Sequence, residues 1–273
     1  MAPVPPPIPP APAAAQYGPA RFPALRTIGA LILREMSTRY GRTPGGYIWA
    51  ILEPLGAILA LSIAFSLVLR TPPLGTSFIL FYASGYMPFS FYQSISNMVA
   101  RSISFSKPLL QYPTVSWIDA VLGRLLLNAL TGILVAILLF SSIIFLLHDH
   151  TRISMLPAIT AFGLAALMAL GVGLVNCAVM GLIPLWERAW AILTRPLFLA
   201  SGVFFIYEAM PTGAQNVLWY NPLLHITGMM RTAIYPTYTP TYISPVYVLV
   251  IALTLITLGL ILMGRYHRDI LNR

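Results

Sequence analysis

The sequence predicts an all-α integral membrane protein with six transmembrane helices. Three observations support this fold class: 58% of the residues are hydrophobic, only 8% are charged, and the mean hydropathy is +0.80. A soluble domain carries about 25% charged residues. Several uninterrupted apolar runs of about 20 residues instead match a hydrocarbon core about 30 Å thick. Because these runs do not alternate between polar and apolar residues, they do not fit the strands of a membrane β-barrel.

The first element of regular structure is predicted to be an amphipathic helix over residues 25–40. Apolar residues recur there at helical spacing, but the charged residues exclude a membrane span and favour the lipid surface. Arg34 lies on its polar side, whereas Arg39 falls on the apolar side. The preceding residues 1–20 are rich in proline and alanine, and we expect a disordered tail rather than a signal peptide. Residues 21–273 are expected to form one transmembrane domain.

Six spans are predicted after this helix, over residues 47–69, 78–98, 118–147, 155–183, 190–207 and 246–264. Gly45 and Gly46 provide a turn into the first span. Glu53 lies inside that span, where it faces the headgroups or a wet interior, since exposing a carboxylate to lipid is unfavourable. In the fourth span, small residues recur every four positions and predict a seam of close helix packing. They are Ala161, Ala165, Ala169, Gly173, Cys177 and Gly181.

The fifth span is unusual because only residues 197–207 are free of charge and proline. Eleven helical residues cover about 16 Å, which is too short to cross a bilayer. Two alternatives remain. Either the span begins near Trp190, although residues 184–196 otherwise predict a loop, or residues 210–244 cover the rest of the bilayer thickness. Those residues are cut by four prolines and predict two short re-entrant helices. Such backbone is tolerated where protein or a water-filled path surrounds it.

The positions of the cationic residues orient the spans. An even number of spans places both termini on one side of the membrane. With the termini inside, thirteen of the sixteen Lys and Arg residues are cytoplasmic, and the exceptions are Arg70, Arg152 and Arg231. Cytoplasmic loops are enriched in these residues, so we expect both termini to be cytoplasmic. Arginines that flank the membrane spans also account for the net charge of +9. A nucleic-acid partner is not needed to explain it, because the residues outside the spans form no basic face.

No catalytic or metal-binding motif is recognisable. The single lysine, Lys107, is followed by proline and ends no glycine-rich turn, so the phosphate-binding loop of an ATPase is absent. A carrier coupled to an ion gradient usually needs a polar or charged site near the middle of the membrane. The strongest candidate within a span is Asn176, and one asparagine is a weak signal, so this class of carrier is disfavoured. His148 and His150 are interpreted as a polar turn instead of a metal site. The chain is therefore not expected to be an enzyme, and energy for uphill transport must enter through another subunit.

The second span is rich in aromatic residues, among them Tyr82, Tyr86, Phe89 and Tyr92. Aromatic belts at the membrane surfaces and packing between helices are two ordinary uses of such residues. The alternative is a wet path in which sugar rings stack on aromatic faces. Because a belt should not reach the middle of a span, the positions of Tyr82, Tyr86 and Phe89 favour this path. We therefore treat the four side chains as candidates for its lining.

Two stretches resemble the permeases of ABC-2 type transporters, and most closely those of the capsular-polysaccharide export branch. Residues 38–56, TRYGRTPGGYIWAILEPLG, are similar to the start of the first span in that family. Residues 201–231, with SGVFF, MP and NPLLHITGMMR, are similar to the segment from the short fifth span through the re-entrant helices. Many relatives carry an acidic residue three positions after the position of His225. Gly228 stands there in this chain, so a charge pair with Arg231 does not carry over.

The resemblance implies a homodimeric permease of the bacterial inner membrane, bound to two ATPase subunits that hold ATP and Mg²⁺, with no cofactor in this chain. It implies that the entrance helix and residues 101–112 contact the ATPase, and that residues 210–234 form a periplasmic gate. The cargo would be a lipid-linked acidic polysaccharide, passed on to periplasmic and outer-membrane export proteins. The candidate residues are Arg34, Arg39, Arg42, Trp49 and Glu53 at the entrance, Arg101, Lys107, Pro108 and Tyr112 in the coupling loop, and Asn221, Pro222, His225 and Arg231 at the gate.

Two other functions fit parts of this pattern. One is an ABC-2 exporter for a different cargo, such as O-antigen, teichoic acid or a drug. A narrow apolar cavity would favour the drug exporter. The other is a membrane scaffold or enzyme subunit that transports nothing. The predicted re-entrant segment argues against a scaffold, which has no use for a broken helix within the bilayer.

Overall fold

The computed structural model describes residues 23–40, 46, 48–111, 115–147 and 153–272, which form a bundle of helices with no strand among them. The prediction of an all-α fold is therefore confirmed. The predicted tail (residues 1–20), Arg42, Tyr112 and the polar turn at residues 148–150 lie outside these described ranges.

Four of the helices are long and apolar enough to cross a membrane. They are α2 (Ile48–Ser66), α5 (Trp117–Leu147), α6 (Met155–Leu182) and α10 (Pro245–Asn272), and they correspond to predicted spans one, three, four and six. The second predicted span forms α3 (Phe78–Ala100), whose 23 residues extend about 34 Å. Its tyrosines, serines and amides lower its hydropathy, and most of its residues are buried against other helices rather than facing outward.

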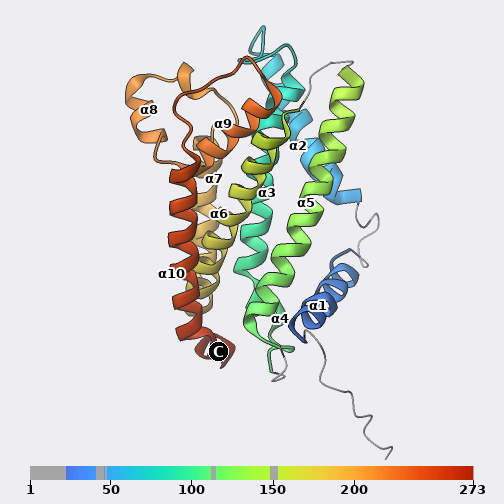
Figure 1. Ribbon diagram of the computed structural model, residues 1–273, viewed down its shortest axis with the longest axis vertical. Coiled ribbons are helices and arrows are strands. Elements are labelled where there is room, and N and C mark those ends of the chain that lie inside the picture. The colour runs from blue at the N-terminus through green and yellow to red at the C-terminus, as the bar shows by residue number, and fades with distance from the viewer. Residues whose placement is uncertain (1–22, 41–45, 47, 112–114, 148–152, 273) are drawn as a thin grey trace, which may run out of the picture.

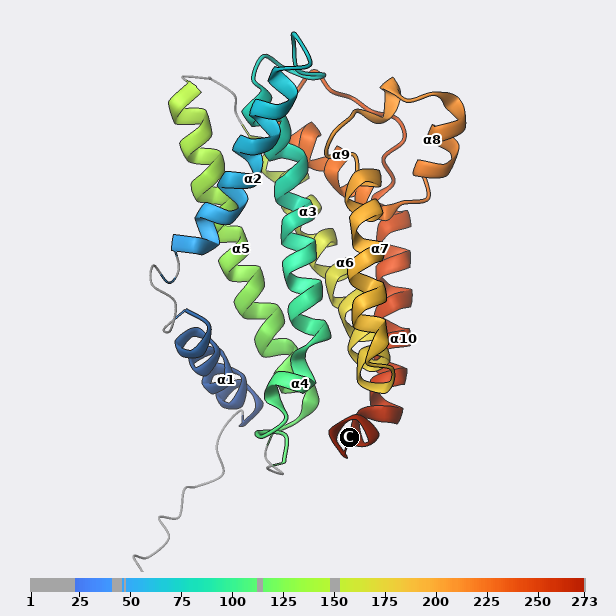
Figure 2. The same ribbon diagram turned by 180° about the vertical axis from the view of Figure 1, so that it is seen from behind.

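Figures 1 and 2 show α3 and α6 at the centre, with α2 and α5 along α3 and with α10 along α6. The amphipathic helix α1 (Pro23–Tyr40) lies against the lower end of α5, at the same end of the bundle as the short helix α4 (Ser102–Ser106) and the C-terminus. The opposite end holds the turn at residues 67–77 together with α8 (Thr212–Leu218) and α9 (Pro222–Ile234). These are called the α4 end and the α9 end below.

The seam of small residues predicted on α6 is confirmed as a packing surface. Its alanines are fully buried. A Cβ atom added to Gly173 would lie 2.7 Å from the side chain of Val99 on α3, and one added to Gly181 would lie 2.5 Å from Ile270 on α10. Larger side chains would therefore push the neighbouring helices away, and the small residues allow α6 to contact both of them closely.

The helix of the fifth predicted span begins and ends earlier than the sequence predicts. Helix α7 covers Leu185–Ala200, so the predicted loop at residues 184–196 is helical and the predicted helix to residue 207 stops early. Glu187 in the first turn suits the positive end of a helix dipole. Gly202 comes after the last turn with a φ of +76°, the left-handed conformation with which glycine commonly ends a helix. A short 3₁₀ turn, η1 (Tyr207–Ala209), comes after the irregular residues 201–206.

Candidate functional site

A groove with a volume of about 520 Å³ lies between α2, α3 and α5. Its lining combines aromatic faces with hydroxyl and amide groups. Among the described residues that line it, the side chains able to carry a charge are Glu53 and Tyr86. The principal contributors are Trp49 and Glu53 from α2, Tyr86, Phe89, Ser90, Gln93, Ser94 and Asn97 from α3, and Asn128 and Thr131 from α5. The described lining of the groove therefore offers hydrogen bonds and flat apolar surfaces but no cationic side chain.

The polar lining contributed by α3 runs along one face of that helix. Ser90, Gln93, Ser94 and Asn97 are spaced by three, one and three residues, which places them on neighbouring turns of the same side. All four line the groove, and none of them is among the candidate residues predicted from the sequence. Their helical spacing within an otherwise aromatic span is the signal that identifies them.

The four candidate aromatic residues of α3 divide between the groove and the core. Tyr86 and Phe89 line the groove. Tyr82 and Tyr92 are 0% and 2% exposed and lie within the packed helices. The ring of Tyr82 contacts the ring of Phe65 on α2, with 5.2 Å between the centroids. In the single chain, a path along the groove therefore uses two of these four side chains.

The entrance candidates surround the start of α2. Gly46 adopts a φ of +43°, which confirms a glycine turn before that helix. Trp49 is 57% exposed and lines the groove together with Glu53, which is also exposed. Arg34 is exposed on α1. The side chain of Arg39 and the whole of Arg42 lie outside the described part of the chain.

The predicted coupling loop contains a short helix that the sequence pattern does not predict. This helix, α4, comes directly after Arg101, whose Nη2 atom lies 2.7 Å from Oε1 of Glu187 at the start of α7. Both side chains of this ion pair are about half exposed, so it contributes little to stability. Lys107 and the exposed Pro108 come directly after α4.

At the α9 end, polar side chains of α9 hold the irregular residues that come after α7. The amide of Asn221 donates to the carbonyl oxygen of Ala200 at 3.0 Å, and the hydroxyl of Thr227 donates to that of Ser201 at 2.6 Å. Arg231, which is 1% exposed, donates through Nη1 to Phe205 (2.7 Å) and through Nη2 to Val203 (3.2 Å). Buried carbonyl groups require partners, and α9 supplies them where the helical ladder of α7 has ended.

Asn221 and Pro222 also start α9 itself. The side-chain oxygen of Asn221 accepts a hydrogen bond from the backbone N–H of Leu223 at 3.1 Å, the usual contact of an N-cap residue. Pro222 occupies the first turn, where its missing N–H group leaves no helical bond unmade. These two gate candidates thus fix the position at which the second short helix begins.

His225 joins α8 to the start of α10. The backbone N–H of Ser244 donates to its Nδ1 atom at 3.2 Å, so the proton of the neutral ring lies on Nε2. Nε2 then donates to the carbonyl oxygen of Trp219 at 2.8 Å. The imidazole is fully buried and contacts the rings of Trp219, Tyr242 and Tyr247. This cluster is a compact aromatic cap over the α9 end.

The glycine at position 228 is required by the same cap. A Cβ atom at Gly228 would collide with the hydroxyl oxygen of Tyr242. Tyr242 stacks on Tyr207 with 4.2 Å between ring centroids, and burial raises the pKa of its phenol to about 12. Tyr242 therefore fills the space that any side chain at position 228 would need. Arg231 lies over the ring of Phe81, 4.4 Å from its centroid.

Within residues 23–40, 46, 48–111, 115–147 and 153–272, no group of three or more His, Cys, Asp or Glu residues could hold a metal ion.

Asn176, the strongest polar candidate within a span, accepts a hydrogen bond from Nε1 of Trp186 at 2.8 Å and so links α6 to α7.

Comparison with known proteins gives consistent matches. The family model described as ABC-2 type transporter matches residues 26–235. The polysialic acid transport protein KpsM of Escherichia coli is 32% identical over 213 residues, covering 78% of this chain and 82% of the relative. The capsule polysaccharide export inner-membrane protein CtrC of Neisseria meningitidis serogroup A is 27% identical over 245 residues, covering 90% and 92%. The corresponding BexB protein of Haemophilus influenzae is 29% identical over 247 residues, with the same coverage.

Proposed function

Because the chain belongs to the ABC-2 type transporter family, we propose that it is the membrane-spanning permease of an ATP-driven exporter of capsular polysaccharide. It is a transport subunit and not itself an enzyme. Its relatives are named for polysialic acid transport and for capsule polysaccharide export across an inner membrane, which supports the same cargo class here. The resemblance to the capsule-export branch found in the sequence is thereby confirmed.

The groove between α2, α3 and α5 carries this proposal, because its chemistry suits a sugar chain. Hydroxyl and amide groups such as Ser94 and Asn97 can exchange hydrogen bonds with sugar hydroxyls. The faces of Tyr86 and Phe89 offer apolar surface for the C–H face of a pyranose ring. A drug exporter would favour a narrow apolar cavity, and this lining is mixed. The acidic groups of the cargo would remain outside the groove, toward the arginines of the α4 end.

We propose that six spans cross the bacterial inner membrane, with α3 and α7 added to the four long apolar helices. Helices α8 and α9 would re-enter the membrane from the periplasmic side as the gate, and both termini would be cytoplasmic. The arrangement in Figure 1 supports this orientation, because α1, α4 and the end of α10 gather at one end of the bundle and α8 and α9 at the other.

The energy would come from two ATPase subunits that bind ATP and Mg²⁺ and contact α1 and α4 at the cytoplasmic surface. A second copy of the chain would complete the permease, and periplasmic and outer-membrane export proteins would receive the polysaccharide. Membrane lipids would contact the exposed apolar faces of α2, α5 and α10, on which many large hydrophobic side chains lie outward.

Disruption of the gene in its host tests the proposed function. Polysaccharide should then accumulate inside the cell while the amount at the surface falls, measured by separate assays of intact and lysed cells. Normal surface polysaccharide in the disrupted strain would overturn the proposal.

The groove is tested by a Ser94→Trp variant, which fills it. The matched control is Leu134→Trp, at a position on α5 that is 57% exposed and does not line the groove. Both variants should reach the membrane in normal amounts, but only Ser94→Trp should lose export. Normal export in Ser94→Trp, in a host that depends on the gene, would reject the groove as the path and leave the permease function standing.

A further inference from the structure

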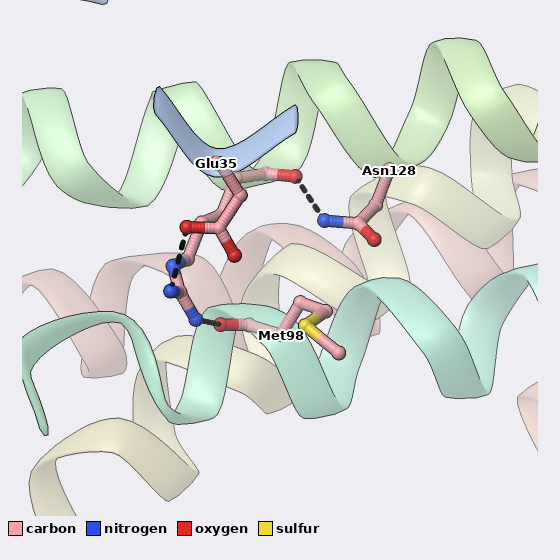
Figure 3. Close-up of polar contacts among 4 residues, drawn as sticks. Glu35, Met98 and Asn128 are labelled. Carbon is pink, nitrogen blue, oxygen red and sulfur yellow. Dashed lines mark hydrogen bonds and ion pairs between the residues drawn. The ribbon is translucent and has the colours of Figure 1, made fainter. Parts of the chain in front are cut away.

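Arg124 is a buried charged residue that does not line the groove. It lies near the start of α5, where a charged residue is expected to stay at the membrane interface, yet it is only 5% exposed. Its Nη2 atom donates to Oε2 of Glu35 on α1 at 2.9 Å, and its Nη1 atom donates to the carbonyl oxygen of Met98 on α3 at 3.4 Å. Figure 3 labels Glu35 and Met98 and draws both of these contacts as dashed lines.

The same guanidinium also contacts α4. Its carbon atom lies 4.8 Å from the centroid of the Phe105 ring, within the range of a cation–π interaction. Phe105 is 58% exposed, so a partner that docks on α4 would touch the ring that Arg124 contacts. Side chains or backbone of α1, α3 and α4 therefore meet at one residue of α5.

Arg124 is joined to the groove through two residues that line it. Nδ2 of Asn128, one turn further along α5, donates to the backbone oxygen of Arg124 at 2.7 Å, as Figure 3 shows. Asn128 lines the groove, and so does Met98, whose carbonyl oxygen accepts from Arg124. A shift of α5 at Arg124 would therefore act on two groove residues, Asn128 on α5 and Met98 on α3.

The contacts around Arg124 differ from those of the other ion pair at this end of the bundle. The side chains of Arg124 and Glu35 are 6% and 23% exposed, whereas those of Arg101 and Glu187 are 50% and 53% exposed. An exposed pair can break and be hydrated at little expense. A pair held this far from water keeps its geometry, because separating the charges leaves a buried cation without its partner. The Glu35–Arg124 pair is therefore harder to separate than the exposed Arg101–Glu187 pair.

We infer that Arg124 is a positioning residue that links the ATPase-facing helices α1 and α4 to the groove, so that movement of the partner alters the cargo path. This inference rests on the proposed function. It assigns the Glu35–Arg124 ion pair to coupling between ATP hydrolysis and export, in addition to holding α1 on α5.

The test uses the complete permease–ATPase complex reconstituted in liposomes, with the polysaccharide of its host. ATP hydrolysis and polysaccharide transport are measured together, and their ratio is compared among variants. Arg124→Gln and Glu35→Gln remove the ion pair from either side. Arg268→Gln, on the exposed last turns of α10 at the same end of the bundle, is the matched control.

We expect both ion-pair variants to assemble and hydrolyse ATP while polysaccharide moved per ATP falls at least about fivefold, the lower end of typical coupling between sites. The control should keep the wild-type ratio. If Arg124→Gln fails to accumulate, the nearly isosteric Glu35→Gln decides the question. The inference is overturned if Glu35→Gln keeps the wild-type ratio of polysaccharide moved per ATP. It is also overturned if hydrolysis and transport fall in parallel, in proportion to the amount of assembled complex. A wild-type complex that moves no polysaccharide would instead contradict the proposed function.

Discussion

Replacing Arg231 with lysine tests whether α9 holds the irregular end of α7. The planar guanidinium donates to two carbonyl oxygens at once, those of Phe205 at 2.7 Å and Val203 at 3.2 Å. Lysine keeps the positive charge, but its single ammonium group cannot reproduce this forked geometry. One of the two buried carbonyl oxygens should therefore lose its partner, while the charge still lies near the ring of Phe81.

The expected size of the effect is set by that single lost contact. A hydrogen bond to a charged group contributes about 1.5–3 kcal/mol. In a chain of this size a change of 1 kcal/mol shifts the melting temperature by about 2–4 °C. The Arg231→Lys variant should therefore melt about 3–12 °C below the wild type. Thr227→Val, which removes the 2.6 Å hydrogen bond to Ser201, should act in the same direction with about half the magnitude, since its donor is neutral.

The assay is the loss of the monodisperse peak in fluorescence-detected size-exclusion chromatography after heating the detergent-solubilised protein. Arg268→Lys, at an exposed position on α10, should melt with the wild type and controls for the chemical change alone. If Arg231→Lys and Thr227→Val both melt within about 1 °C of the wild type, the contacts of α9 do not stabilise the end of α7, and that part of the reasoning fails.

Two further predictions concern the seam and the groove. Gly173→Val should overpack α6 against Val99 and destabilise the fold by about 1–3 kcal/mol. Gly163→Val on the same helix is the control and should not destabilise the fold, because an added Cβ there meets nothing within 4 Å. Equal melting temperatures of the two variants in the same chromatographic assay would contradict the packing role of the seam. In a variant whose single cysteine is replaced by alanine, Ser94→Cys should react with a charged, water-soluble thiol reagent if the groove is the proposed wet path, whereas Leu134→Cys, on the exposed outer face of α5, should be shielded by lipid. Labelling is measured by a mass shift, and equal labelling of the two variants would show that the groove is not a distinct aqueous space.

The long apolar helices can be predicted from the sequence because their lengths reflect the membrane itself. The starts of α5 and α6, at Trp117 and Met155, lie within one residue of the predicted starts. The error at α7 has a local cause: the absence of charge in residues 197–207 favours a helix to the end of that run, but the left-handed conformation of Gly202 ends it. A glycine at that position is a local signal for an earlier helix end.

The burial of Arg124 could not be predicted from its place in the sequence. A charged residue seven positions into α5 looks like an interface residue, and no local pattern shows that α1 lies against it. Its environment depends on Glu35, which is 89 residues away in the chain, and on a carbonyl oxygen of α3. The partition of the aromatic residues is a similar case, because only tertiary packing separates the buried Tyr82 from the groove-lining Tyr86.

The position of α3 explains how the two ends of the molecule can act on one path. Near its start, Phe81 lies beneath the guanidinium of Arg231, which belongs to α9. Near its end, the carbonyl oxygen of Met98 accepts from Arg124, which also contacts α1 and α4. The polar face that lines the groove lies between these contacts on the same helix. The hydrogen-bonded ladder that stiffens α3 lacks one bond at Pro88, which has no backbone N–H group and lies between Phe81 and the polar face. Movement imposed at the α4 end is therefore expected to reach the groove first, because the helix is continuous from Met98 back to the polar face, whereas Pro88 separates that face from the contact with α9.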